Sequence, residues 1–287
     1  MTTNTGIRGS IAKARRIERV LGVGVLCVLS FLFLIPFFIT LGDSVKSFRE
    51  VYAVPRIWIP QSPRWSNFSD IFHVLPFHLF IRNTICITTL SLIGQCASAC
   101  LVGYSFARLR WPFRDFFFIL LLSTIMLPGQ ITMIPLFLLF NQFGWVNTWL
   151  PLIVPAYFGG GVFNIFLLRQ FFKTIPTSLE EAAKIDGCSH LRILFTIMIP
   201  LAKPAVVTIC VLGFIGSWND FMNPLIYLSD YFKYPISLGV YMFKDAQGIF
   251  PHYVMAASLV SIVPVMILFF SAQRYFIEGI ALTGTKG

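Results

Sequence analysis

The sequence has little charge. Only 12% of its 287 residues are Asp, Glu, Lys or Arg, whereas 56% are hydrophobic. Soluble domains usually carry about 25% charged residues, so this composition excludes an ordinary soluble enzyme. It also excludes an intrinsically disordered chain, because 31 Phe residues and a 16% aromatic share would collapse in water. The composition therefore predicts a protein that lies in a membrane.

Catalytic and nucleotide-binding motifs are missing as well. The sequence contains no G-x-x-x-x-G-K-[ST], H-E-x-x-H or G-x-S-x-G, so it predicts no ATP cradle, no catalytic residue and no metal site. The triplet at residues 159–161 is all glycine within an apolar stretch, which favours a close helix contact over a phosphate loop.

None of the six cysteines lies in a predicted extracytoplasmic loop, which excludes a disulfide framework. Cys96 and Cys100 share a helix face without a His or carboxylate, which favours packed free thiols over a metal pair.

Long uncharged stretches are what the sequence does have. A bilayer crossing needs about 20 apolar residues. The run from Phe116 to Leu168 must cross twice, with a turn between Asn141 and Asn147. We therefore predict an all-α membrane protein: a segment 1–19 followed by a transmembrane domain 20–287. Its six transmembrane helices are expected at residues 20–41, 83–107, 116–140, 149–170, 204–228 and 254–275.

The positive charges predict the orientation of these spans. If both termini are cytoplasmic, 15 of the 22 Lys and Arg residues fall on the cytoplasmic side, as the positive-inside rule requires. Residues 1–19 then form a cytoplasmic N-terminal segment. Topology and contacts with lipid headgroups account for the net charge of +10, so no nucleic acid partner is needed.

One predicted cytoplasmic loop, 171–200, has the pattern of a helix–turn–helix. Ser178 and Glu181 are spaced as a capping box, which predicts a helix over residues 179–186. Gly187 supplies the left-handed residue that ends it, and Ser189 begins a second helix that continues to residue 199. The first helix is expected to expose a face of small residues, Ala182 and Ala183, to another protein. An ordinary amphipathic connector fits the same pattern.

At this point the sequence resembles a known family. Glu181-Ala182-Ala183, then Gly187, Ile197 and Ile199-Pro200 resemble the EAA signature of bacterial ABC importer permeases. Three further motifs resemble its carbohydrate branch, in particular maltose-type second permeases: Arg82-Asn83-Thr84, Trp218-Asn219-Asp220-Phe221, and Gln273-Arg274-Tyr275-Phe276 with the terminal Thr-Lys-Gly. The resemblance extends over about residues 15 to 287.

The resemblance implies a type I importer fold and a set of partners. These are a second, homologous permease, two ATP-binding subunits that hold ATP and Mg, and an extracytoplasmic solute-binding protein, all at the bacterial inner membrane. It implies that this multi-pass chain is not itself an enzyme. The residues expected to couple to the ATPase are Glu181, Ala182, Ala183, Asp186 and Gly187. The tail residues Gly284, Thr285, Lys286 and Gly287 are expected to contact the ATPase dimer, and the loop 245–252 to reach the binding protein.

The candidate translocation pathway is a polar group in the fifth span: Trp218, Asn219, Asp220 and Asn223. A carboxylate inside a bilayer is costly unless it faces water or a partner. Carboxylate, amide and indole groups also suit sugar hydroxyls and rings. Two alternatives stay open for Asp220, namely a bond to a neighbouring helix and a gate that never touches cargo. For the chain, the alternatives are another solute such as glycerol phosphate, or an ion-coupled carrier, which usually shows internal repeats and buried ionisable residues.

Overall fold

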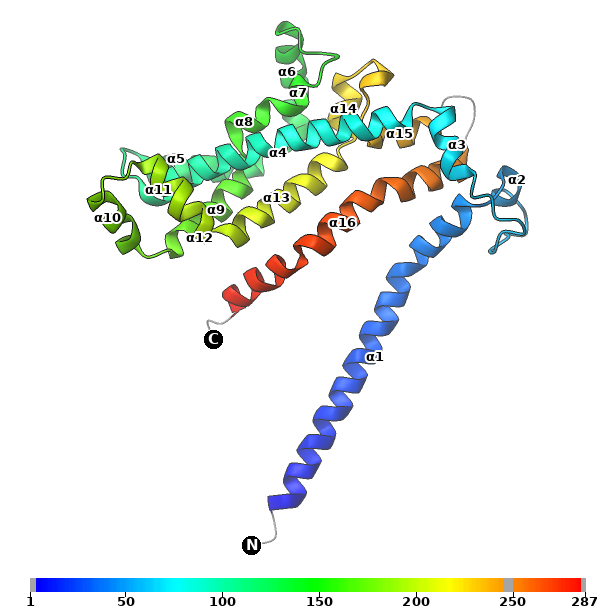
Figure 1. Ribbon diagram of the computed structural model, residues 1–287, viewed down its shortest axis with the longest axis horizontal. Coiled ribbons are helices and arrows are strands. Elements are labelled where there is room, and N and C mark those ends of the chain that lie inside the picture. The colour runs from blue at the N-terminus through cyan, green and yellow to red at the C-terminus, as the bar shows by residue number, and fades with distance from the viewer. Residues whose placement is uncertain (1–3, 245–249, 285–287) are drawn as a thin grey trace.

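The computed structural model describes residues 4–244 and 250–284, with side chains described for residues 18–244 and 250–273. Every regular element in these ranges is helical, which confirms the all-α part of the predicted fold class. The main helices are α1 (Asn4–Ser44), α4 (Phe77–Arg108), α9 (Val162–Thr174), α13 (Lys203–Trp218) and α16 (Pro251–Gly284). Figure 1 shows α4, α13 and α16 running along the length of the molecule.

Shorter elements connect these helices. Between α1 and α4 lie α2 (Phe48–Val51) and α3 (Asn67–Val74). Between α4 and α9 lie α5 (Arg114–Ser123), η1 (Thr124–Met126), α6 (Gly129–Gln142), α7 (Leu150–Ile153) and α8 (Pro155–Gly159). Between α9 and α13 lie α10 (Thr177–Ile185), α11 (His190–Ile193), the π-helical turn η2 (Leu194–Met198) and α12 (Ile199–Leu201). Before α16 come α14 (Met222–Tyr227), η3 (Tyr231–Lys233) and α15 (Ile236–Met242).

Four stretches of the described chain are long and apolar enough to cross a membrane as single helices: Glu18–Ser44, Phe77–Arg108, Leu150–Thr174 and Pro251–Gln273. Two bent pairs bring the number to six if each pair is one crossing. Arg114–Met126 and Gly129–Gln142 meet at 100°, and His190–Leu201 and Lys203–Trp218 meet at 83°. The count of six crossings therefore stays a prediction.

The straight helices expected at residues 116–140 and 204–228 are both interrupted in the structure. The first bend falls at Pro128 and Gly129, where proline cannot continue the preceding helix. The fifth expected span also ends early, because α13 stops at Trp218 and the chain restarts as α14 at Met222. Between α6 and α7, Gly144 and Asn147 both have positive φ, which confirms the predicted turn.

Helix α4 is the centre of the packing and contacts α8, α9 and α13. One apolar cluster joins α4, α9 and the α10–α13 region, and a second joins α3, α4, α13, α15 and α16. Gly160 allows a close approach of two backbones, because a Cβ there would lie 2.6 Å from the backbone nitrogen of Ala99. The predicted close helix contact at the glycine triplet is thereby confirmed.

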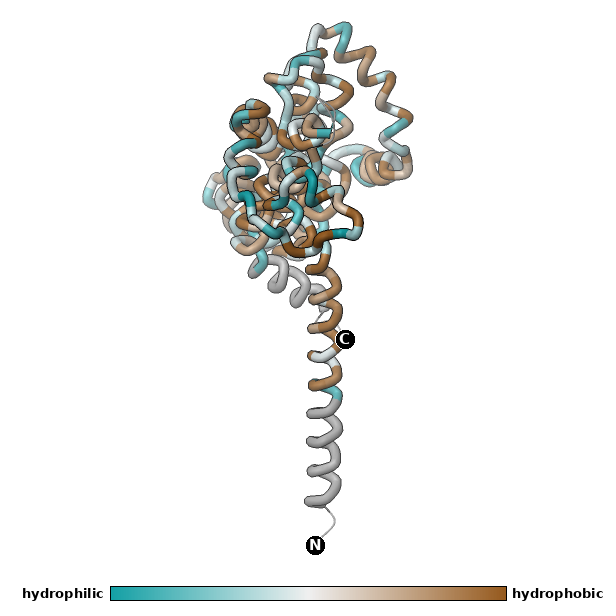
Figure 2. The backbone as a smooth tube through the Cα atoms, turned by 90° about the vertical axis from the view of Figure 1, so that its right-hand side faces the viewer, coloured by the Kyte–Doolittle hydropathy of each residue, from teal (hydrophilic) through white to brown (hydrophobic). Residues whose placement is uncertain are grey.

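Helix α1 stands apart from this bundle. It meets α16 only toward the end at which α2 and α3 lie (Figure 1). Figure 2 shows its described part hydrophobic over nearly its whole length as it projects from the body. The 18-residue apolar window of α1 has no buried residue in the single chain. An apolar surface of this size needs lipid or another apolar chain to cover it.

Candidate functional site

The loop predicted to couple to a partner forms two short helices. Pro176 precedes α10, and Gly187 ends it with φ +78°. The amide of Gly187 donates to the carbonyl of Lys184 (3.0 Å), and the amide of Cys188 donates to that of Ala183 (2.9 Å). These two bonds make a Schellman cap. The Ser189 hydroxyl then accepts from the amide of Arg192 and starts α11, so the predicted turn and second N-cap are both confirmed.

Two details of that prediction are wrong. Ser178 makes no capping bond, because α10 already begins at Thr177 behind the fixed φ of Pro176. Ala183 is buried in the apolar cluster rather than exposed beside Ala182. The second helical stretch also continues past residue 199 to Leu201.

A buried ion pair, which no sequence pattern indicates, anchors α10 to the bundle. Arg108, at the end of α4, places its Nε 3.0 Å from Glu180 Oε1, with side-chain exposures of 7% and 6%. The same guanidinium donates to the carbonyl of Phe172 (2.5 Å) and to that of Ile175. Arg108 therefore ties α10 and the end of α9 to α4. Sequence inspection favoured Glu181, one residue later, because only Glu181 matched a known motif.

Arg169 makes a second such link between helices. It lies 8% exposed on α9, and its Nε donates to the carbonyl of Phe106 (3.3 Å). Its guanidinium carbon sits 3.8 Å from the ring centroid of Phe118, a cation–π distance. These contacts hold α9 against α4 and α5.

The α10 helix presents two different outer faces. Glu181 and Lys184 line a cavity of about 830 Å³ together with the connection between α4 and α5. Ala182 and Ile185 lie on the other side, where the Ile185 side chain is 87% exposed. An exposed isoleucine beside an exposed alanine is a small apolar contact surface on an otherwise polar helix.

The fifth predicted span contains the second candidate site, at the break between α13 and α14. The Asp220 carboxylate accepts from the amide of Asn223 (3.2 Å) and from its side-chain Nδ2 (2.9 Å). Its backbone carbonyl accepts from the Ser237 hydroxyl (2.6 Å). Asp220 also lines a cavity of about 20 Å³ with Thr84, Thr88 and Ser217. Asp220 thus caps the N-terminus of α14 and faces a small polar space.

The other residues of this candidate group are placed differently. Trp218 is 3% exposed, stacks on Phe214 and donates its indole N–H to the carbonyl of Ser261 (3.0 Å). It therefore joins α13 to α16 and, in this conformation, does not face a pathway as predicted. Asn219 is exposed and bonds back to the carbonyl of Ile215 (2.8 Å). The sequence could not separate these roles because all four residues are consecutive or nearly so.

The Asn83-Thr84 motif holds the chain beside this break. The Asn83 side chain is fully buried and donates to the carbonyls of Phe232 (2.8 Å) and Tyr234 (3.0 Å). The Thr84 hydroxyl accepts from the amide of Ile236 (2.7 Å). These bonds fix the segment before α15 to α4.

Asp220 allows a test of charge against capping. Asp220→Asn keeps an oxygen that can accept from the amide of Asn223, whereas Asp220→Ala removes the cap and costs about 1 kcal/mol of stability. If Asp220 lies on the predicted translocation pathway, both variants should lose most transport, because both remove the carboxylate charge. Uptake into whole cells, normalised to the amount of chain in the membrane, measures this. Normal transport by Asp220→Asn with a defect only in Asp220→Ala would assign Asp220 to capping alone.

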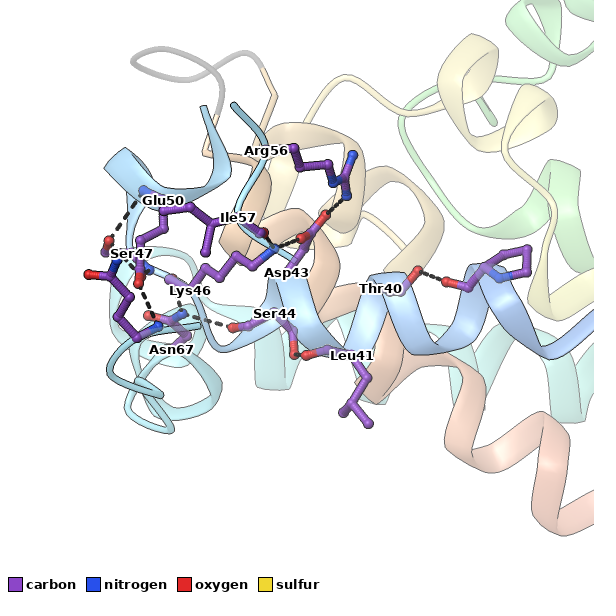
Figure 3. A network of polar contacts seen from close by, with 12 residues as sticks. Thr40, Leu41, Asp43, Ser44, Lys46, Ser47, Glu50, Arg56, Ile57 and Asn67 are labelled. Atoms are coloured by element: carbon purple, nitrogen blue, oxygen red, sulfur yellow. Dashed lines mark hydrogen bonds and ion pairs between the residues drawn. The ribbon is translucent and has the colours of Figure 1, made fainter. Parts of the chain in front are cut away.

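A third polar cluster fixes the end of α1 (Figure 3). Lys46 is 1% exposed, and its ammonium donates to Asp43 (2.5 Å) and to the carbonyl of Ile57 (2.6 Å). Arg56 donates to the second oxygen of Asp43 (2.8 Å). The Asn67 amide donates to two backbone carbonyls of the same turn, at 2.8 and 2.9 Å. These bonds hold the loop after α1 against the end of that helix.

Two further predicted sites fall wholly or partly outside the described residues. Residues 285–287 of the tail and 245–249 of the aromatic loop are not described. Gly284, the first of the predicted tail residues, is the last residue of α16. No group of three or more His, Cys, Asp or Glu side chains among the described residues could hold a metal ion. Of the two cysteines on one face of α4, Cys96 instead lies 3.1 Å from Cys210 on α13.

The sequence matches the model of a protein family described as "Binding-protein-dependent transport system inner membrane component" over residues 99–281. The chain belongs to this family. The match includes α10, α11 and the break at Asp220, so both candidate sites lie inside the family's own region.

Other members of the family are similar along nearly the whole chain. The arabinooligosaccharides transport system permease protein AraQ of Halalkalibacterium halodurans is 34% identical, over 90% of this chain and 94% of its own. The melibiose/raffinose/stachyose import permease protein MelC of Bacillus subtilis is 31% identical, over 98% of this chain and all of its own. A solved bacterial ABC transporter involved in alginate import matches with a TM-score of 0.79 and 26% identity, over 92% of this chain and 98% of that one.

The family confirms the resemblance found in the sequence. The chain is a permease component of a binding-protein-dependent ABC importer, and its several apolar helices agree with a multi-pass membrane location. Members of this family form the membrane part of a transporter.

Proposed function

We propose that this permease imports a sugar or an oligosaccharide across a bacterial inner membrane, as half of a pore with a second, homologous permease. The observation that carries the proposal is the similarity to the two sugar permeases over at least 90% of this chain. The uncovered apolar length of α1 supports the second permease as a partner, since a pore of two chains would cover part of it. An extracytoplasmic solute-binding protein delivers the cargo.

In this proposal α10 couples the pore to one of two ATPase subunits, which bind ATP and Mg. Its open face, with Ala182 and Ile185, enters a groove of the ATPase, while Glu181 meets a basic residue at the edge. Asp186 and Gly187 shape the tight end of the helix. The buried Arg108–Glu180 pair supports this role, because it makes α10 move with α4 and α9. The terminal residues 284–287 contact the ATPase dimer.

The charge at the α13–α14 break favours a neutral sugar over an anionic cargo. Asp220 is the acidic member of a small polar space otherwise lined by hydroxyl and apolar groups. A carboxylate repels phosphate esters and accepts bonds from sugar hydroxyls. Another similar permease, UgpE of Pectobacterium atrosepticum, is named for the transport of sn-glycerol-3-phosphate. Glycerol phosphate is therefore the second candidate for the cargo of this chain.

Substrate uptake in a strain that lacks this chain tests the proposal. The native chain should restore energy-dependent uptake of labelled oligosaccharides and leave uptake of glycerol 3-phosphate unchanged. If the native chain restores uptake of glycerol 3-phosphate and not of oligosaccharides, the cargo is glycerol phosphate and the proposed sugar is wrong.

Within that assay, Glu181→Lys tests the coupling role. Reversing this exposed charge should abolish uptake and release the ATPase subunit on purification, because like charges then meet at the interface. Glu18→Lys, which reverses another exposed acid, on α1, is the control and should keep the ATPase subunit. Normal uptake and normal ATPase retention in Glu181→Lys would remove α10 from the coupling path.

A further inference from the structure

The 830 Å³ cavity beside α10 has more positive than negative charge. Of its four Arg and Lys residues, Arg108 is paired with Glu180, and Arg114 is paired with Asp115 (3.1 Å). Arg110 and Lys184 are exposed, and neither forms an ion pair with another described residue. The carboxylate of Glu181 lines the same cavity, so Arg110, Lys184 and Glu181 together leave one positive charge in excess, a balance that attracts a singly charged anion.

An apolar surface continues directly from this cavity. A second cavity of about 420 Å³ shares Arg110, Trp111 and Arg114 with the first and adds Phe113, Phe116 and Asp115, whose carboxylate is paired with Arg114. Phe113 is 75% exposed and Phe116 is 62% exposed. Phe113 holds a left-handed backbone, φ 60°, which is uncommon for a bulky residue. Beyond them the outer side of α5 remains apolar and exposed, including Ile119.

We propose that these adjoining cavities bind the phosphate headgroup of an anionic phospholipid, whose acyl chains lie along the exposed side of α5. Arg and Lys donors suit phosphate oxygens, and a basic pocket beside apolar helices is a known form of lipid site. Trp111, at the junction, is a residue type enriched at membrane–water interfaces. A soluble anion would use the cations but would leave the aromatic surface of α5 uncovered.

The headgroup would also add a link between two segments beside the buried Arg108–Glu180 pair. Arg110 belongs to the α4–α5 connection, and Lys184 belongs to α10. A singly charged phosphate between them, together with the carboxylate of Glu181, balances both cations and holds α10 by its cavity face. The adjacent face, with Ala182 and Ile185, stays open for another protein. The bound lipid therefore sets the position of α10, independently of the cargo that the permease carries.

The test uses the full chain in nanodiscs of phosphatidylcholine that contain phosphatidylglycerol with a photoactivatable acyl chain. Labelled peptides should come from α5. The double variant Arg110→Gln/Lys184→Gln should weaken labelling by about fivefold for each charge removed. The matched control, Arg49→Gln/Lys244→Gln, removes two exposed cations near the opposite end of the bundle and should label like the native chain. Arg110→Lys/Lys184→Arg, which keeps the charge, should label normally and excludes a folding defect as the cause.

Three results would overturn the lipid site. Labelling of α5 by a photoactivatable phosphatidylcholine to the same extent would show contact without headgroup recognition. Competition by inorganic phosphate or free glycerol phosphate at equal headgroup concentration would assign the cavity to a soluble anion. Loss of the label when ATPase subunits assemble on the chain would assign the cavity to a protein partner. Each result is independent of uptake, so a failure here leaves the proposed function standing.

Discussion

Arg108→Ala should lower the free energy of unfolding by about 3–5 kcal/mol, because it leaves Glu180 as an uncompensated buried charge. It also removes the donor that the carbonyls of Phe172 and Ile175 use at the end of α9. We expect α10 to detach from α4 and the ATPase subunit to be lost on purification. Chemical unfolding of the full chain in detergent micelles measures the first effect, and co-purification measures the second.

A double variant separates the charge from the packing. Arg108→Met/Glu180→Leu removes both charges and should recover part of the lost stability, since an apolar pair can replace a buried ion pair at little cost. Arg192→Ala, an exposed arginine on the neighbouring α11, should change stability by less than about 0.5 kcal/mol. If Arg108→Ala is as mild as Arg192→Ala, the ion pair does not anchor α10.

Gly160→Ala should destabilise the protein by about 2–5 kcal/mol, because two costs coincide at this residue. Its φ of +56° disfavours any side chain, and the new Cβ would lie 2.6 Å from the backbone of Ala99 on α4. Backbone cannot move aside as a flexible side chain can, so α8 must shift away from α4. The same unfolding measurement in detergent reports the loss.

Two other glycines serve as matched controls for Gly160. Gly144 has φ +69° with nothing within 4 Å of a Cβ, so Gly144→Ala should show the dihedral cost alone, about 1–2 kcal/mol. Gly216 lies in open space within α13, and Gly216→Ala should be neutral or stabilising by up to about 1 kcal/mol. Equal losses at Gly160 and Gly144 would mean that the α8–α4 contact contributes nothing.

The sequence alone determined those features of this protein that depend only on nearby residues. The scarcity of charge and the apolar runs determined an all-helical membrane chain, since a span depends only on the length and polarity of its own residues. Gly187, Ser189 and the turn at Gly144 and Asn147 were predictable because a cap or turn is set within about four residues. The EAA pattern and the three further motifs determined the family.

Tertiary packing decided what those local rules could not reach. Arg108 and Glu180 are 72 residues apart in the sequence, and only the meeting of α4 with α10 makes them a pair. Their pairing also turns α10 so that Ala183 is buried and Ile185 is exposed, against the face predicted from the motif. Trp218 and Asp220 are neighbours in the chain, yet α16 covers the first and the break before α14 frees the second. Burial depends on which helices come together, and that depends on long-range contacts, which a local sequence pattern does not contain.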